Sequence, residues 1–238
     1  MHVELHPNYA DSAQGQQARE LISACVHCGF CLATCPTYLA TRDERDSPRG
    51  RIYLIKQLLE SGEASDRTHT HLDRCLTCRS CETTCPSGMQ YGQLIDIGRE
   101  LMEARVPRPL HQRGLRWLLR RSLTTTRLFA AALRLGQWAR PLLPTALRRR
   151  VPARQAAGPV PTHKRERSML LLEGCVQRAA SPATNAAARR VLDRLGISLH
   201  SAPRAGCCGA VNYHLAAHDD GLDDMRRNID AWWPLLEA

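Results

Sequence analysis

Two stretches in the first 105 residues repeat apolar side chains at the spacing of a helix face. In the stretch RIYLIKQLLESG, residues 51–62, the apolar face consists of Ile52, Ile55, Leu58 and Leu59. Ser47-Pro48 has the form of a helix N-cap followed by proline in the first turn, and Gly62 fits the C-terminal end. Residues 92–105 repeat the pattern with Leu94, Ile95, Ile97, Leu101 and Met102. This region is therefore predicted to be helical.

The pattern changes in the last third of the chain. Residues 168–172 form a short apolar run, which predicts a buried strand. Residues 181–196 predict a helix that Ser181-Pro182 begins and Gly196 ends, and residues 197–200 predict a second strand. A strand, a helix and a strand at this spacing predict a βαβ unit, with a parallel strand pair and a right-handed crossover.

Between these regions the chain is polar and basic. Two amphipathic helices are predicted over about 110–121 and about 125–139, and residues 151–163 have the composition of a Pro/Ala linker. Residues 106–167 carry 15 Lys and Arg against one Glu, whereas residues 1–105 and 168–238 have net charges of −3 and −1. The overall charge of +10 therefore belongs to the middle segment, and we predict three segments with these boundaries.

Eight of the eleven cysteines repeat one spacing, Cys-x2-Cys-x2-Cys-x3-Cys-Pro. The first run is Cys25, Cys28, Cys31 and Cys35, and the second run is Cys75, Cys78, Cys81 and Cys85. This is the bacterial ferredoxin run, in which three cysteines hold one [4Fe–4S] cluster and the fourth ligates the other cluster. We therefore expect cluster 1 on Cys25, Cys28, Cys31 and Cys85, and cluster 2 on Cys75, Cys78, Cys81 and Cys35.

Zinc and disulfides are the alternative uses of these cysteines. Structural zinc is usually bound by separated Cys-x2-Cys pairs, and a run of four with a terminal proline fits it poorly. Disulfides need an oxidising compartment, and the start MHVELHPNYADSAQG has neither the basic nor the apolar region of a signal peptide. No apolar run reaches the roughly 18 residues of a membrane span. We expect reduced metal ligands in a cytoplasmic protein, with contact to the inner membrane face as an option.

Three stretches resemble a known family. CVHCGFCLATCPTYL, SPRGRIYLIKQLLESGE and HLDRCLTCRSCETTCPSG look like the iron–sulfur subunit of bacterial glycolate oxidase. That family pairs an α-helical ferredoxin domain holding two [4Fe–4S] clusters with cysteine-rich modules of the CCG type. Anaerobic glycerol-3-phosphate dehydrogenase, lactate-utilisation proteins and heterodisulfide reductase share this architecture, and the matches GRIYLIKQ and NIDAWWP favour glycolate oxidase. The resemblance implies a helical ferredoxin domain, a basic helical linker and a partial α/β module.

The remaining cysteines follow the two predicted strands, where open α/β sheets place their ligands. Cys175 and the pair Cys207-Cys208 resemble the opening of a CCG module, which in that family is completed by a further Cys-x2-Cys. This sequence lacks the further pair, so we expect a C-terminally truncated chain with an incomplete third metal site. Zinc and an unusual iron–sulfur cluster are both chemically reasonable for the complete module. Buried thiols without a metal are the alternative.

The basic segment allows four interpretations. It is a solvated connection, a docking surface for an acidic partner subunit, a contact with an anionic membrane face, or a nucleic-acid site. The last fits least, because no nucleic-acid-binding motif and no aromatic stacking platform accompany the charge.

The chain carries no site that would oxidise a substrate. It has no Gly-x-Gly-x-x-Gly after a strand and no acid–base or nucleophile constellation, so no catalytic residue is assigned. The resemblance implies an electron-transfer subunit of a glycolate oxidase, which relays electrons from a FAD-containing subunit through two clusters to a quinone or another acceptor. The alternatives are the equivalent subunit of glycerol-3-phosphate or lactate oxidation, a scaffold with structural clusters, and a cluster-containing redox sensor that binds nucleic acid.

Overall fold

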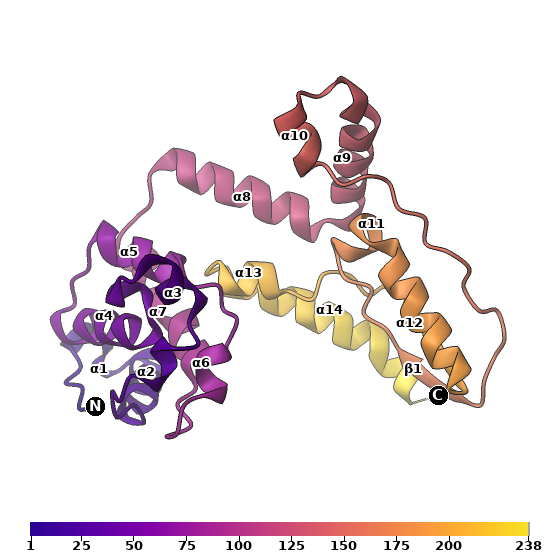
Figure 1. The fold of residues 1–238 in the computed structure, drawn as a ribbon. Coiled ribbons are helices and arrows are strands. Elements are labelled where there is room, and N and C mark those ends of the chain that lie inside the picture. Colours follow the sequence, from indigo (N-terminus) through magenta and orange to yellow (C-terminus); the bar gives the residue numbers. More distant parts are fainter. Residues whose placement is uncertain (238) are drawn as a thin grey trace. The chain divides into compact units, whose positions relative to one another are not determined.

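The structure is a computed structural model that describes residues 1–237 and divides the chain into two units (Figure 1). Residues 1–109 with residues 214–216 form the first unit, and residues 110–213 with the segment from Ala217 onward form the second. Within the described part of the chain, no helix has both the length and the apolarity that crossing a membrane requires.

The first unit consists of helices and connecting loops, and its described residues contain no strand. Its α-helices are α1 (Pro7–Ala10), α2 (Ala13–Ser23), α3 (Pro36–Thr41), α4 (Pro48–Ser61), α5 (Asp66–Asp73), α6 (Ser80–Thr83) and α7 (Tyr91–Arg105). Two 3-10 turns, η1 (Phe30–Leu32) and η2 (Glu44–Asp46), lie beside the cysteine runs and the start of α4. The expected helical setting of the cysteines is thereby confirmed.

The ends of α4 follow from local sequence. The Ser47 hydroxyl accepts a hydrogen bond from the Gly50 amide at 2.9 Å, and Pro48 occupies the first helical position. Gly62 ends the helix in the left-handed conformation, at φ +71°. Both helix-end predictions for this segment are confirmed.

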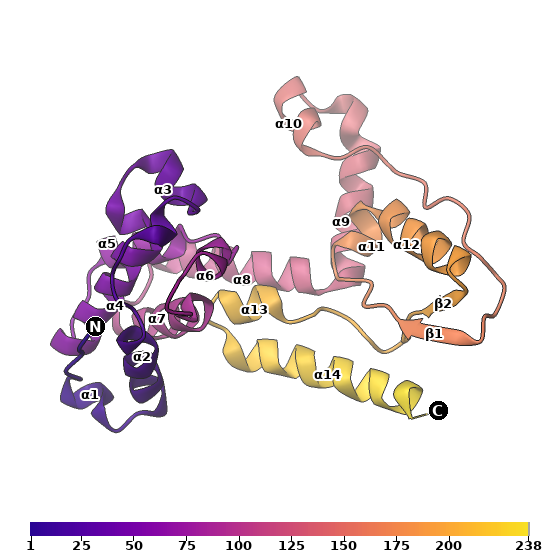
Figure 2. The ribbon, with the colours of Figure 1, turned by 60° about the horizontal axis from the view of Figure 1, so that its bottom comes forward.

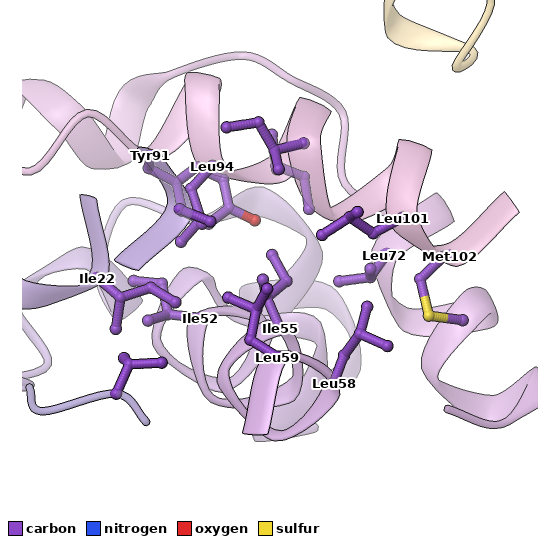
Figure 3. Close-up of a cluster of buried hydrophobic side chains, with 14 of the residues drawn as sticks. Ile22, Ile52, Ile55, Leu58, Leu59, Leu72, Tyr91, Leu94, Leu101 and Met102 are labelled. Atoms are coloured by element: carbon purple, nitrogen blue, oxygen red, sulfur yellow. The ribbon is translucent and has the colours of Figure 1, made fainter. Parts of the chain in front are cut away.

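One apolar core lies where α2, α4, α5 and α7 meet (Figure 3). Its fully buried side chains include Ile22, Ile55, Leu59, Leu72, Leu94, Ile95 and Met102. Gly98 lets α7 approach α4 closely, because a Cβ there would lie 2.6 Å from Ile55 Cδ1. Cysteines of both runs pack against the edge of this core, so the packing of the helices also positions the metal-ligating loops.

The second unit begins with three helices, α8 (Leu110–Thr124), α9 (Thr126–Ala139) and α10 (Thr145–Arg150), with the 3-10 turn η3 (Arg140–Leu142) before the last. Helices α8 and α9 match the two predicted amphipathic segments, whereas α10 was not predicted, and none of the three has a buried side chain. Trp117 and Trp138 are 61 % and 78 % exposed. Residues 152–165 contain no helix or strand, as the linker composition predicted.

The rest of the second unit is built on a βαβ arrangement, which Figure 2 shows from below. Strand β1 (Arg167–Leu170) pairs in parallel with β2 (Ile197–His200), and α11 (Gln177–Ala180) and α12 (Pro182–Arg194) lie between them in sequence. The predicted parallel pair is confirmed. The first strand ends at Leu170 rather than at Leu172, although the Leu171 amide still donates to the His200 carbonyl at 2.7 Å. The prediction that this strand is buried is wrong, because Arg167, Ser168 and Met169 are exposed and Leu170 is half-buried. Two helices follow, α13 (Ala210–His214) and α14 (His218–Leu236).

Candidate metal centres

Both cysteine runs adopt the same unusual backbone conformation. In the first run His27 and Gly29 have φ angles of +59° and +87°, and in the second run Thr77 and Arg79 have +51° and +57°. The left-handed conformation costs a non-glycine residue about 1–2 kcal/mol. Such strain is retained where the surroundings impose it, and it concentrates at functional sites. The two runs are therefore repeats in conformation as well as in spacing.

Two hollows in the first unit collect all eight cysteines of the runs. The first hollow, with an empty volume of about 420 Å³, has as its cysteines Cys25, Cys28, Cys31, Cys81 and Cys85. The second hollow, of about 290 Å³, has Cys35, Cys75, Cys78 and Cys81. In both, the fourth cysteine of one run lies beside the first three of the other run.

Thiol donors in sets of four suit a [4Fe–4S] cluster, so the residues present fit the group. Each hollow brings together the four cysteines that the sequence assigned to one cluster, with Cys81 bordering both. The ligand assignment itself stays a prediction.

The first cysteine of each run accepts a hydrogen bond from the backbone. The His27 amide donates to Cys25 Sγ at 3.4 Å, and the Thr77 amide donates to Cys75 Sγ at 3.5 Å. Both donor residues are left-handed, so the two runs repeat this contact as well. Hydrogen bonds to sulfur are one of the means by which a protein sets a cluster's potential.

The last cysteine of each run has a hydroxyl neighbour two residues later. Thr37 Oγ1 lies 3.2 Å from Cys35 Sγ, and Ser87 Oγ lies 3.3 Å from Cys85 Sγ. Cys35 is buried and Cys85 is half-buried. The two hydroxyls have equivalent positions in the two runs, but only the Thr37 hydroxyl is hydrogen-bonded to a charged side chain in the protein interior.

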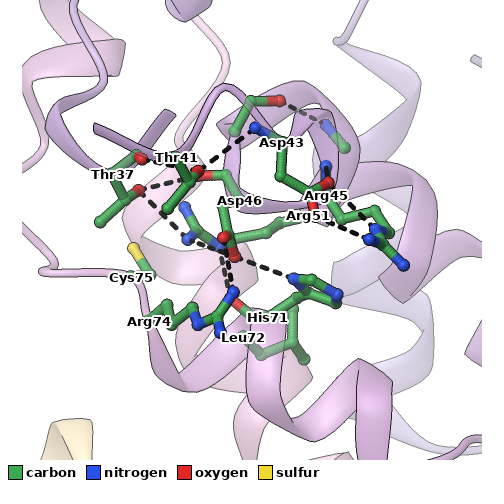
Figure 4. A network of polar contacts seen from close by, with 12 residues as sticks. Thr37, Thr41, Asp43, Arg45, Asp46, Arg51, His71, Leu72, Arg74 and Cys75 are labelled. Atoms are coloured by element: carbon green, nitrogen blue, oxygen red, sulfur yellow. Dashed lines mark hydrogen bonds and ion pairs between the residues drawn. The ribbon is translucent and has the colours of Figure 1, made fainter. Parts of the chain in front are cut away.

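Behind Thr37 lies a buried network of charged groups (Figure 4). Arg51 donates from Nη2 to Thr37 Oγ1 at 3.2 Å and from Nε to the His71 carbonyl at 2.7 Å. Asp46 Oδ1 lies 3.7 Å from Arg51 Nη2 and 2.8 Å from His71 Nδ1, and its Oδ2 lies 2.8 Å from Arg74 Nη1. Arg51 and Asp46 are both fully buried. Burial opposes the charge on Asp46, but the bonds from His71 and Arg74 hold the pKa of this carboxyl below its ordinary value.

The first hollow has a more open counterpart of this network. Arg49 lines it and pairs with Glu44 at 2.5 Å, with side chains that are 25 % and 53 % exposed. Gly29 makes room for this arginine, since a Cβ there would lie 2.8 Å from Arg49 Nη1. The pair is therefore in contact with solvent, whereas Arg51 is not.

Tyr91, at the start of α7, lines both hollows. It is buried, and its hydroxyl donates to Cys75 Sγ at 3.6 Å.

Burial, with further contributions from Cys75 and Cys31, raises the pKa of the Cys81 thiol to about 12. A metal must displace the proton of such a thiol in order to bind.

In the second unit the structure brings two of the three remaining cysteines together. Cys175 follows β1 and Cys207 follows β2, and their sulfurs are 3.6 Å apart and buried. Asn228 fixes the second of these loops, because its side chain donates to the Cys207 carbonyl at 2.7 Å and accepts from the Gly206 amide at 2.8 Å. Cys208 points to the surface. The structure thus brings Cys175 and Cys207 together and leaves Cys208 exposed, and the expected third metal site stays a prediction.

Sequence reasoning did not find the network of Asp46, Arg51, His71 and Arg74. One signal was present: Arg51 directly precedes Ile52 and lies on the same helical face as Ile55, so it places a charge within an apolar stripe. A charge at such a position is buried only when it is paired.

Comparison with known proteins adds two family matches. Residues 21–89 match the 4Fe-4S dicluster domain, and residues 169–237 match the Cysteine-rich domain. The chain joins a dicluster ferredoxin domain to a cysteine-rich domain. The dicluster match confirms the expected [4Fe–4S] clusters and, together with the helices and the small parallel sheet, the expected fold class.

Two curated relatives confirm the resemblance noted from the sequence. The chain is 53 % identical over its whole length to the glycolate oxidase iron-sulfur subunit of Escherichia coli (strain K12). Over 87 % of its length it is 30 % identical to the probable glycolate oxidase iron-sulfur subunit of Bacillus subtilis (strain 168). The chain spans 59 % and 53 % of these relatives' lengths. No solved structure matches it.

Proposed function

We propose that this chain is the electron-transfer part of a 2-hydroxy-acid oxidase of the glycolate oxidase type. The observation that carries the proposal is the gathering of eight cysteines at two hollows within a dicluster domain. A bound [4Fe–4S] cluster supplies reversible transfer of single electrons. The names of both relatives support glycolate as the substrate of the whole complex, with glycerol-3-phosphate or lactate as the alternative.

The ligands that we assign follow the two hollows. One cluster is held by Cys25, Cys28, Cys31 and Cys85, and the other by Cys75, Cys78, Cys81 and Cys35. Apolar residues of the first hollow, including Ile52, Met89 and Tyr91, lie beside the sulfurs and lower the local dielectric. Tyr91 stands at both hollows, so electrons passing between the clusters would pass close to this side chain.

Substrate oxidation belongs to a partner in this proposal. The sequence lacks a dinucleotide-binding motif, and no acid–base constellation was found in it. A flavin-containing subunit would release two electrons, which the two clusters would accept one at a time. The acceptor beyond them would be a quinone or another carrier. Both relatives are named as subunits, which supports a complex of several chains.

The experiment begins with anaerobic reconstitution and iron analysis. We expect about eight irons per chain, as two [4Fe–4S] clusters require, and reduced clusters visible by EPR. Mixing the loaded chain with a flavin-containing glycolate-oxidising partner should then give cluster reduction that depends on glycolate. Two results would support a structural role instead. One is a metal content no higher than a single-ion site of the zinc type would bind, and the other is clusters that no reductant at accessible potential reduces.

The basic segment supports peripheral contact with an anionic membrane surface. Its helices α8 and α9 bury no side chain and combine arginines with exposed Trp117 and Trp138. Basic amphipathic helices with tryptophan bind at the lipid interface, and each basic residue contributes about 1 kcal/mol near an anionic surface. Flotation with anionic vesicles, but not with neutral vesicles, is expected and should weaken with salt. Equal flotation with both would contradict this contact.

Cys175 and Cys207 are proposed as two ligands of a third metal site in the second unit. Their buried sulfurs, 3.6 Å apart, support this assignment. Metal analysis of the double variant Cys175→Ser/Cys207→Ser should show less bound metal than the parent chain, while Cys208→Ser should bind as much as the parent. Equal metal in all three proteins would leave the pair as buried thiols.

A further inference from the structure

The two hollows differ in the cation that borders them. Arg51 lines the second hollow from the start of α4 and is 0 % exposed. Arg49 lines the first hollow, but its side chain is 25 % exposed and its partner Glu44 is 53 % exposed. Coulomb interactions are screened by water and strengthen several-fold in a protein interior. The same charge therefore acts more strongly on the second hollow than on the first.

The orientation of the buried ion pair also matters. Arg51 and Thr37 line the second hollow, whereas Asp46, His71 and Arg74 are not among its lining residues. The guanidinium thus borders the hollow directly, and the carboxylate with which it pairs does not (Figure 4 shows the two side chains with Thr37 and Cys75). Arg79 lines the same hollow and adds a second cation. The positively charged side chains therefore lie on the side of the cysteine sulfurs of the second hollow.

Thr37 connects this charge to a cysteine. Its hydroxyl accepts a hydrogen bond from Arg51 Nη2 and has one proton of its own, which can point to the Asp46 carbonyl at 2.8 Å or to Cys35 Sγ at 3.2 Å. A cysteine that ligates iron is a thiolate and has no proton to donate. In the contact between Thr37 and Cys35 only the Thr37 hydroxyl can then donate, in competition with its bond to the Asp46 carbonyl, and the bond from Arg51 polarises this hydroxyl further.

From this geometry we propose that Arg51 is a positioning residue that, through its charge and through Thr37, raises the reduction potential of the cluster in the second hollow above that of the cluster in the first. The inference rests on the proposed function. Reduction adds one negative charge to a cluster, so a nearby buried cation and hydrogen bonds to its sulfurs stabilise the reduced form. Tyr91 adds a further donor, to Cys75, on the same side. Electrons entering the chain therefore settle at the second hollow.

The test is a redox titration of the loaded chain followed by EPR, with Arg51→Met, Arg51→Lys and Thr37→Val. The wave of each cluster is assigned with Cys85→Ser, which leaves four thiolates only at the second hollow. In the parent chain the second-hollow cluster should be reduced first. In Arg51→Met the ratio of reduced to oxidised second-hollow cluster should fall about tenfold at a fixed potential, equivalent to about 59 mV for one electron.

The other variants separate charge from structure. Arg51→Lys keeps the charge and should recover most of the ratio, and Thr37→Val should shift the same wave in the same direction by less. Arg49→Met is the matched control on the same helix and should leave the second wave in place. If Arg51→Met fails to fold, Thr37→Val decides, because it leaves the ion pair intact.

Two outcomes overturn the inference while the proposed function stands. One is a reduction potential of the second-hollow cluster that neither Arg51→Met nor Thr37→Val changes. The other is an Arg51→Lys chain that behaves like Arg51→Met, since charge would then not be the cause. A parent chain without two reducible clusters would instead contradict the proposed function itself.

Discussion

The two hollows of the first unit share their arrangement of cysteines and differ in what lies behind it. In each, the fourth cysteine of one run lies beside the first three of the other, and both place left-handed residues between the cysteines. Behind Cys35, however, stand Thr37 and a fully buried ion pair, while behind Cys85 stands Ser87 near solvent. The repeat thus specifies how a cluster is held, and residues outside the repeat make the two environments unequal.

The largest expected effect comes from exchanging the crossing cysteines one at a time. Cys35→Ser should remove the cluster of the second hollow and Cys85→Ser that of the first, each with loss of about half of the iron. Iron analysis and EPR of the reduced chains measure both. If Cys35→Ser instead abolished the signal that Cys28→Ser also abolishes, and left the other, the crossover would be wrong.

Removing the buried carboxylate should have the next largest effect. Asp46→Asn leaves Arg51 with an unpaired buried charge, and breaking a buried pair in this way costs about 3–5 kcal/mol of unfolding free energy. Thermal unfolding followed by circular dichroism is the measurement. Asp43→Asn, which removes an exposed pair with Arg45, is the control and should leave the midpoint nearly unchanged. Equal midpoints for the two variants would mean that the buried network contributes no stability.

A smaller effect is expected at the equivalent left-handed positions of the two runs. Gly29→Ala places a side chain at φ +87° and 2.8 Å from Arg49, at a cost of about 1–3 kcal/mol. The second run carries Arg79 at this place, at φ +57°, so an exchange to alanine there adds no new strain of this kind. Unfolding midpoints of Gly29→Ala and Arg79→Ala compare the two, and a larger loss for Arg79→Ala would contradict this account.

The smallest effect is expected from the exposed hydroxyl of the first hollow. Ser87→Ala removes the contact to Cys85 but no buried partner, so stability should change by less than about 0.5 kcal/mol. The shift in the first cluster's potential should also be smaller than the shift that Thr37→Val causes in the second. If Ser87→Ala shifted the first cluster's potential more than Thr37→Val shifts the second's, the proposed asymmetry between the hollows would be contradicted.

Local sequence was sufficient for much of this structure. The cysteine spacing grouped the residues that the two hollows bring together, and the apolar faces of residues 51–62 and 92–105 became α4 and α7. The βαβ unit followed from two short apolar runs with a capped helix between them. These features depend on neighbours within a few turns of chain, which a sequence displays directly.

Other features depend on distant partners and could not be predicted. Asp46 comes from η2, Arg51 from α4 and His71 from α5, and only their packing makes one network of them. Cys207 is buried against Cys175 while its neighbour Cys208 is exposed, because the loop held by Asn228 turns only one of them inward. No pattern along the chain distinguishes these two adjacent cysteines.

The crossing of the fourth cysteines has a consequence for the chain as a polymer. With the proposed ligands, one cluster ties Cys85 to the loop that begins at Cys25, and the other ties Cys35 to Cys75, so each is a covalent bracket around α4 and α5. Closing loops of this length by a cross-link removes disorder from the unfolded chain worth about 3–5 kcal/mol each. With these ligands the inorganic clusters would act as cross-links of the helical fold, and oxidative loss of either one would loosen the same two helices.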